Sequence, residues 1–122
     1  MSCVLSFQRL EVYRCAIELL ALVGDISHEL PRGHAERSDQ LIRAAESVVR
    51  NIAEGAGRWS GRDSSKHYKI ARGEAMECAA SLDILRLRSL VSGERYAHAL
   101  GLLERVVAML TKMVAQPHDS SP

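Results

Sequence analysis

Hydrophobic side chains recur every three or four residues along most of the chain, which is the spacing of one face of an α-helix. The pattern predicts four helices, at residues 7–30, 39–58, 62–90 and 94–114. The first should end at Leu30, because a residue that precedes proline disfavours the helical conformation and Pro31 follows. Glycine and serine residues separate the other stripes, as expected of turns.

Small polar residues stand where these helices should begin. Ser6, Ser60, and either Ser38 or Asp39 can accept a hydrogen bond from a first-turn amide, so we expect them to be N-caps. Gly73 lies inside the third stripe, where glycine costs about 1 kcal/mol relative to alanine. A glycine tolerated at such a position indicates that another backbone comes close, so we expect tight helix packing there.

Four amphipathic helices joined by short turns favour an all-α fold, an antiparallel up-down-up-down four-helix bundle that forms a single domain. The bundle should occupy residues 1–115, and the sequence shows no internal repeat and no sign of a second domain. Residues 116–122 are a polar segment with two prolines, which we expect to be a disordered tail.

Composition supports this fold and limits the function. Hydrophobic residues make up 47% of the 122 residues and aromatic residues 4%, which favours helices packed through small and aliphatic side chains. The net charge of +1 predicts neither a polyanion binder nor a strongly acidic protein. No apolar run is long enough to span a bilayer, and no signal peptide is recognised. Cys3, Cys15 and Cys78 have no paired spacing, so we expect a reduced, cytoplasmic protein.

A long and specific motif occupies residues 43–58. It reads RAAESVVRNIAEGAGR and resembles the signature of the bacterial four helix bundle protein family, with its NIAEGxGR core. That family includes proteins encoded in intervening sequences of large-subunit ribosomal RNA genes. The motif is also similar to that of the accessory variability determinants of diversity-generating retroelements.

The resemblance extends over nearly the whole chain. The further matching residues are Phe7, Leu10 and Tyr13, the Leu30-Pro31 turn, Gln40 with Arg43-Ala44, and Ile70-Ala71-Arg72-Gly73 with Glu77. One position departs from the family pattern, because Glu74 stands where the family usually has serine. The resemblance implies a cytoplasmic, non-enzymatic bundle that assembles as a closed homopentamer. For the retroelement branch it implies contact with a reverse transcriptase and with nucleic acid through a basic surface.

Polar residues of the motif share one side of the predicted second helix, namely Arg43, Ser47, Asn51 and Glu54. At about 100° per residue, this side points away from the apolar stripe of the same helix. In a monomer it would be a solvated face with helix-spaced charges. It could instead be a subunit interface, since partners on a neighbouring subunit would offset the cost of Ser and Asn at mid-helix. The resemblance favours the interface, and we therefore expect a homo-oligomer, with a pentamer favoured.

The nearly neutral total charge hides a local basic cluster. Five cations lie close together in the sequence with Asp63 as the only acid among them: Arg58, Arg62, Lys66, Lys69 and Arg72. Trp59, His67 and Tyr68 are interleaved with these cations, and exposed aromatic rings can stack on unpaired bases. The cluster is either a solvated helix start with Tyr68 turned into the core, or a surface that binds the phosphates of RNA or DNA.

The sequence offers little support for catalysis or metal binding. The histidines are scattered, and the Glu-x-x-His tetrad of carboxylate-bridged bundles does not occur. Cys15 and Cys78 lie on or beside apolar stripes, where a thiol is usually a small core residue. The segment 55–58 lacks the preceding strand and the lysine of a phosphate-binding loop. We therefore expect no enzyme, no metal and no cofactor.

Three functions stay open at this level. The first is a nucleic-acid-associated accessory or scaffold protein that uses the basic cluster. The second is a protein–protein adaptor ring without nucleic-acid contact, whose partner would be a reverse transcriptase or another protein. The third is a bundle that binds a small ligand between helices near Gly73. Salt dependence separates the first two, because phosphate binding weakens steeply with salt and apolar docking does so far less.

Overall fold

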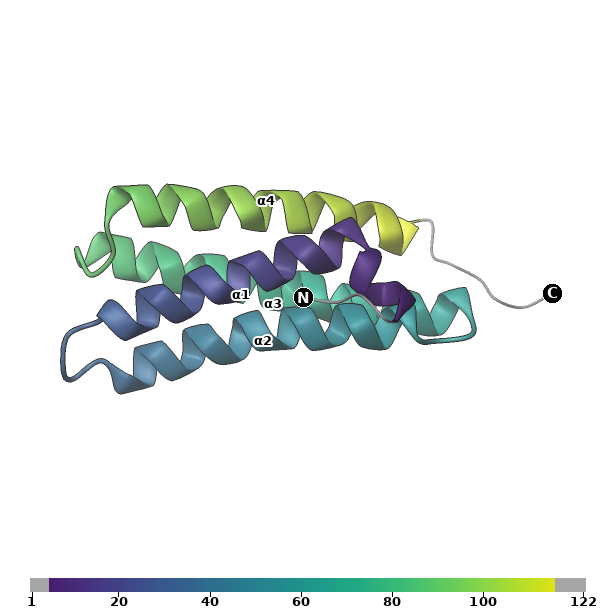
Figure 1. Cartoon of the computed structure of the whole chain (residues 1–122), viewed down its shortest axis with the longest axis horizontal. Coiled ribbons are helices and arrows are strands. Elements are labelled where there is room, and N and C mark those ends of the chain that lie inside the picture. The colour runs from purple at the N-terminus through teal and green to yellow at the C-terminus, as the bar shows by residue number, and fades with distance from the viewer. Residues whose placement is uncertain (1–4, 116–122) are drawn as a thin grey trace.

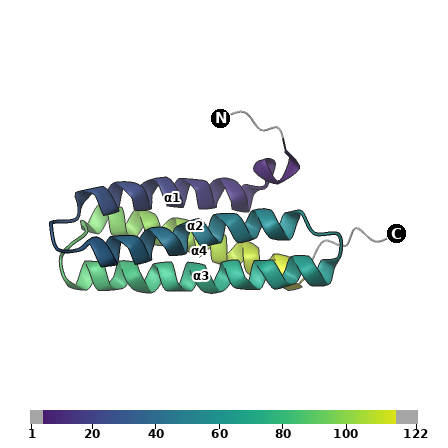
Figure 2. The same ribbon diagram turned by 90° about the horizontal axis from the view of Figure 1, so that it is seen from below.

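Four long α-helices make up most of the computed structural model, which describes residues 5–115. Within that range there is no β-strand, and the elements are η1 (Ser6–Arg9), α1 (Glu11–Glu29), α2 (Ala35–Ala56), α3 (Gly61–Leu87) and α4 (Gly93–Ala115). Helices α1 and α3 each pack against both α2 and α4, and successive helices run in opposite directions (Figure 1; Figure 2). The predicted all-α, up-down-up-down four-helix bundle is therefore confirmed. The predicted tail, 116–122, lies outside the described residues.

The first helix begins later than its apolar stripe predicted. Residues 6–9 form a separate 3₁₀ turn, and Leu10 is extended with φ −63° and ψ 133° before α1 starts. Leu5 precedes the turn, so the prediction that Ser6 is an N-cap is wrong. The apolar stripe predicted one continuous helix because residues three apart also share one side of a 3₁₀ turn. Phe7 and Tyr13 still meet across the break, with ring centroids 5.0 Å apart and planes nearly perpendicular.

The second helix begins one turn earlier than predicted. His34 precedes its first residue and makes no side-chain cap, so Ser38 and Asp39 lie inside the helix and do not cap it. The prediction followed the apolar stripe, which starts at Leu41, whereas the preceding residues include good helix formers such as Ala35.

The third helix has the predicted start and an unpredicted end. The Ser60 hydroxyl oxygen accepts a hydrogen bond from the backbone N–H of Asp63 at 3.2 Å, which confirms this N-cap. The helix ends at Leu87, three residues before the predicted boundary. Ser89 follows in the left-handed conformation with φ 58°, and the Leu90 amide donates to the Leu85 carbonyl at 2.8 Å. This is the pairing of a Schellman motif, with serine where glycine is usual.

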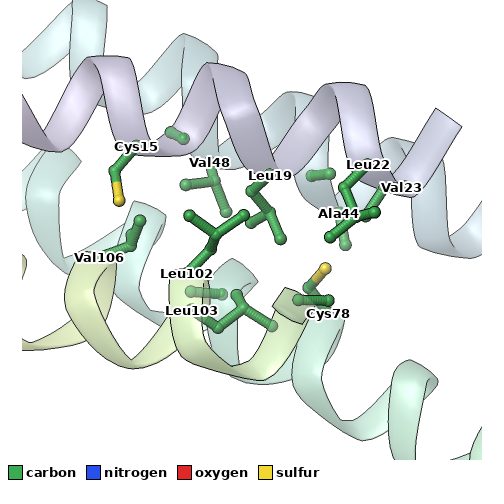
Figure 3. Packing of buried hydrophobic residues seen from close by; sticks show 14 of the residues in the cluster. Cys15, Leu19, Leu22, Val23, Ala44, Val48, Cys78, Leu102, Leu103 and Val106 are labelled. Carbon is green, nitrogen blue, oxygen red and sulfur yellow. The ribbon is translucent and has the colours of Figure 1, made fainter. Parts of the chain in front are cut away.

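The hydrophobic core lies along the common axis of the four helices and consists mainly of aliphatic side chains. The largest fully buried ones are Leu19, Ile26, Leu41, Ile52, Leu82, Leu85, Leu103 and Leu110. Cys15 and Cys78 lie among aliphatic neighbours, as predicted (Figure 3). Burial raises the pKa of the Cys78 thiol to about 12, and burial is also the main cause of a raised pKa at Cys15. Burial thus disfavours the reactive thiolate form of both side chains.

The close approach predicted at Gly73 is found at a different glycine. A Cβ atom at Gly73 would meet nothing within 4 Å, so the prediction of tight packing there is wrong. A Cβ at Gly55 would instead lie 2.5 Å from Cε1 of Tyr68, whose side chain is buried. The end of α2 and the start of α3 can therefore meet only because residue 55 has no side chain.

Candidate functional site

The polar face of α2 turns toward α3 and forms a chain of side-chain contacts with it. The Asn51 amide nitrogen donates to the carbonyl oxygen of Ser47 at 2.9 Å and lies 3.1 Å from the Ser47 hydroxyl. The Asn51 amide oxygen therefore faces His67 of α3, whose Nδ1 lies 3.3 Å away and donates to it. The other ring nitrogen, Nε2, is 4.0 Å from a carboxylate oxygen of Glu54.

These contacts change the meaning of the mid-helix Ser47 and Asn51. Both find hydrogen-bond partners within the chain, so a neighbouring subunit is not needed to offset their presence in the helix. Arg43 and Glu54, by contrast, are exposed at the two ends of the same face. The subunit-interface role of the four residues stays a prediction, which now depends chiefly on the exposed pair.

A groove of about 470 Å³ continues this face between α2 and α3. Its lining residues are Gln40, Arg43, Ala44, Ser47 and Arg50 from α2, and Glu74, Glu77 and Ser81 from α3. Burial raises the pKa of Glu74, a hydrogen bond and the negative charge of Glu77 raise it further, and the charge of Arg50 opposes them. Glu74, at the position where the resemblance implied a serine, therefore presents a carboxyl to the groove that the α2 motif lines.

Two exposed apolar residues flank this groove on α3. Ile70 and Ile84 stand seven residues before and after Glu77, so the three share one face of the helix. Farther round the same helix, Met76 and Leu87 are also exposed, and Leu87 is 84% exposed. This second apolar face was not predicted from the sequence, because only one apolar stripe was expected on each helix. Its sequence signal is the presence of large apolar residues outside the core stripe of α3.

The predicted basic cluster lies at the α2–α3 end of the bundle. Its members differ in whether other side chains of the chain already contact them. Arg58 pairs with Glu54 at 2.6 Å, and the Arg72 side chain donates to the Thr111 hydroxyl at 2.8 Å. Arg62, Lys66 and Lys69 are exposed on one face of α3, and none of the three has an ion pair within residues 5–115. These three side chains form the available part of the cluster.

Two further cations reach the same end from distant parts of the chain. The α2–α3 turn, η1 and the end of α4 lie together there, with Arg9 in the 3₁₀ turn and Lys112 in the last turn of α4 (Figure 1). Both side chains are exposed. These two residues are far from the cluster in the sequence. They lie near it in the structure because the up-down connectivity returns alternate helix ends to one end of the bundle.

The three interleaved aromatic residues have three different environments. Tyr68 is buried in the core at 3% exposure, as the simpler interpretation of the cluster predicted. His67 is mostly buried and bonded to Asn51. Trp59, in the turn between α2 and α3, is 82% exposed. Of the three rings, only the indole has a free face.

A second groove, of about 370 Å³, lies between α3 and α4 beside Gly73, where the small-ligand hypothesis placed a pocket. Its lining residues are Lys69, Arg72, Gly73, Thr111 and Val114. Among residues 5–115, no group of three or more His, Cys, Asp or Glu side chains could hold a metal ion. No helix in that range is both long and apolar enough to cross a membrane.

Fold and surface together define a class of protein, a small four-helix bundle with a polar groove between α2 and α3 and a basic end. The family model of the 23S rRNA-intervening sequence protein matches residues 8–112, so the chain belongs to this family, as its motif indicated. A crystal structure of a protein with unknown function from the S23 ribosomal protein family of Bacteroides thetaiotaomicron VPI-5482 has a similar fold, with a TM-score of 0.78. Sequence identity to it is 22%, and the match covers 84% of this chain and 97% of that one. No curated protein matches the chain.

Proposed function

We propose that the protein is a non-enzymatic, cytoplasmic accessory or scaffold protein that binds RNA or DNA through the basic end of α3. The observation that carries the proposal is the row of Arg62, Lys66 and Lys69, exposed on one helix face with no ion pair to any described residue. Unpaired surface cations are the groups that neutralise phosphates and release their counterions. Arg58 and Arg72 complete the predicted cluster, although their side chains also contact Glu54 and Thr111.

Self-association is the second part of the proposal, and a symmetric homopentamer is the favoured state. The exposed Arg43 and Glu54 of α2, the groove beside them and the exposed Ile70 and Ile84 of α3 are neighbouring surfaces. Exposed apolar side chains beside polar groups are typical of a protein–protein interface. A ring would repeat the basic row by symmetry, so weak contacts with one long nucleic acid would act together.

The exposed apolar face of α3 also favours an alternative function. A protein–protein adaptor would present Ile84, Met76 and Leu87 to a partner, such as a reverse transcriptase, without touching nucleic acid. Such docking would depend on buried apolar area and would change little with salt.

Fluorescence anisotropy with a labelled structured RNA and a labelled duplex DNA tests the first part. If three cations contact phosphates, the affinity for the duplex should fall about 40-fold between about 50 and 200 mM salt. The variant that combines Arg62→Glu, Lys66→Glu and Lys69→Glu should lose this binding.

The matched control carries the same charge change at the opposite end of the bundle, where the turns α1–α2 and α3–α4 and the start of α2 lie (Figure 1). It combines Arg32→Glu, Arg37→Glu and Arg88→Glu and should retain most of the binding. Equal losses in the two variants would show that only total charge matters. Absence of binding by the wild type at low salt would refute the nucleic-acid role and leave the adaptor function.

A further inference from the structure

We propose that Trp59 stacks on an unpaired base and that the surface around it therefore prefers single-stranded nucleic acid. This inference rests on the proposed function, and it specifies which form of nucleic acid that function acts on. It starts from the indole itself, which is 82% exposed although most large apolar residues of the chain are buried.

Trp59 has no evident structural role in its turn. The segment that joins α2 to α3 is fixed on both sides of the indole. On one side the Gly57 amide donates to the Ala53 carbonyl at 3.1 Å, and on the other Ser60 caps α3. The turn therefore needs no packing from residue 59, and a polar side chain there would avoid exposing apolar surface. An exposed indole on a hydrogen-bonded turn offers a flat apolar surface to a partner outside the chain.

Basic residues precede and follow Trp59 in the sequence. Arg58 precedes the indole, and Arg62 lies in the first turn of α3 just after it. Lys66 and Lys69 continue the row along the same face, and Arg62 and Lys69 are about 10 Å apart along the helix axis. The N-terminus of α3, with its partial positive charge, adds to the attraction for phosphates. An indole beside a basic track is the combination with which proteins hold single strands, since bases stack while phosphates follow the charge.

The indole also makes the surface favour single-stranded over double-stranded nucleic acid. Phosphate contacts alone would hold a duplex as readily as a single strand. Within a duplex the faces of the bases are covered by their neighbours, so an aromatic side chain can stack only on a base that has left the helix. Trp59 therefore adds affinity for loops, ends and single strands, and adds nothing for an intact duplex.

The test uses the fact that Trp59 is the only tryptophan of the chain, so its fluorescence reports this position alone. The full chain would be titrated with a uridine oligonucleotide of about 20 nucleotides, longer than typical single-strand sites. A duplex of equal length would serve for comparison. Anisotropy of a labelled copy would measure affinity in parallel. We expect the single strand to quench the indole emission and the duplex to leave it unchanged.

Variants at the same position give the second readout. Trp59→Ala should weaken single-strand binding roughly 5- to 150-fold and leave duplex binding unchanged. Trp59→Phe should keep most of the single-strand affinity, because a phenyl ring still stacks. Light scattering and circular dichroism of each variant would check that oligomer mass and helix content match the wild type.

The outcomes separate this inference from the proposed function. If the wild type binds both nucleic acids with no change in emission and Trp59→Ala binds them equally well, the stacking role is refuted and the phosphate-binding function stands. A lower oligomer mass in Trp59→Ala would place the indole in a subunit contact and would also refute stacking. If neither nucleic acid binds, both the inference and the proposed function are refuted.

Discussion

At the scale of single residues, side-chain type predicted less than position on the helix. Tyr68 and Trp59 are both aromatic and both lie in the basic cluster, yet the first is buried and the second exposed. The helical spacing of Tyr68 with the apolar stripe of α3 fits its burial, which only one of the two interpretations of the cluster included. Trp59 lies in a turn, where helical periodicity predicts nothing, so its exposure could be learned only from the structure. The contact between Asn51 and His67 could not be predicted from the sequence either, because His67 is on another helix.

Glu74 gives a prediction at this scale. Its pKa is raised above the ordinary value of 4.5, mainly by burial and then by Glu77, so the folded state favours the protonated form. The stability that this carboxyl contributes is therefore present below pH 4.5 and is lost as the pH rises through the folded-state pKa. Glu74→Gln should raise the melting temperature at pH 7, and the gain should disappear at about pH 4.

Thermal denaturation of Glu74→Gln between pH 4 and pH 7 measures this effect. Glu104→Gln, the same change at an exposed position of α4, provides the control and should show no comparable gain. A melting temperature of Glu74→Gln below that of the wild type at pH 7 would show that the ionised carboxyl is stabilised there, contrary to the raised pKa.

At the scale of elements, the periodicity of apolar residues predicted all four helices and their order. It predicted the end of α1, the start of α3 and both ends of α4 to within one residue. It did not predict where α1 and α2 start or where α3 ends, because these ends depend on backbone hydrogen bonds that leave no mark in a hydrophobic pattern. Of the proposed caps, only Ser60 acts as one. The 3₁₀ turn before α1 was missed for a related reason, since Phe7 and Leu10 keep helical spacing across the break at Leu10.

Two glycines test how the elements pack. Gly55→Ala should destabilise the protein by about 1–3 kcal/mol, because the new methyl group would overlap the ring of Tyr68. Gly73→Ala should stabilise it by up to about 1 kcal/mol, because alanine favours a helix and its Cβ meets nothing at this site. Urea denaturation at one fixed protein concentration would compare the two variants with the wild type. The opposite order of stabilities would mean that the close helix approach is at Gly73 after all.

At the scale of the whole molecule, connectivity gathers charges that the sequence separates. The net charge of +1 indicated no basic surface, yet Arg9, Lys112 and the row on α3 meet at one end of the bundle (Figure 1). The second apolar face of α3 belongs to this scale too, since no described part of the chain covers it. If it is covered by another copy, Ile84→Asp should lower the oligomer mass, because the interface would then bury a charge.

Multi-angle light scattering of the full chain, alone and with the uridine oligonucleotide, tests the central claim most directly. The central claim is that a symmetric assembly of this bundle binds nucleic acid. We expect a mass of five protomers of 13.5 kDa for the protein alone, and a larger mass, which includes the oligonucleotide, for the mixture at low salt. A protein that elutes at the mass of one protomer, with the oligonucleotide migrating separately, would contradict both the assembly and the binding.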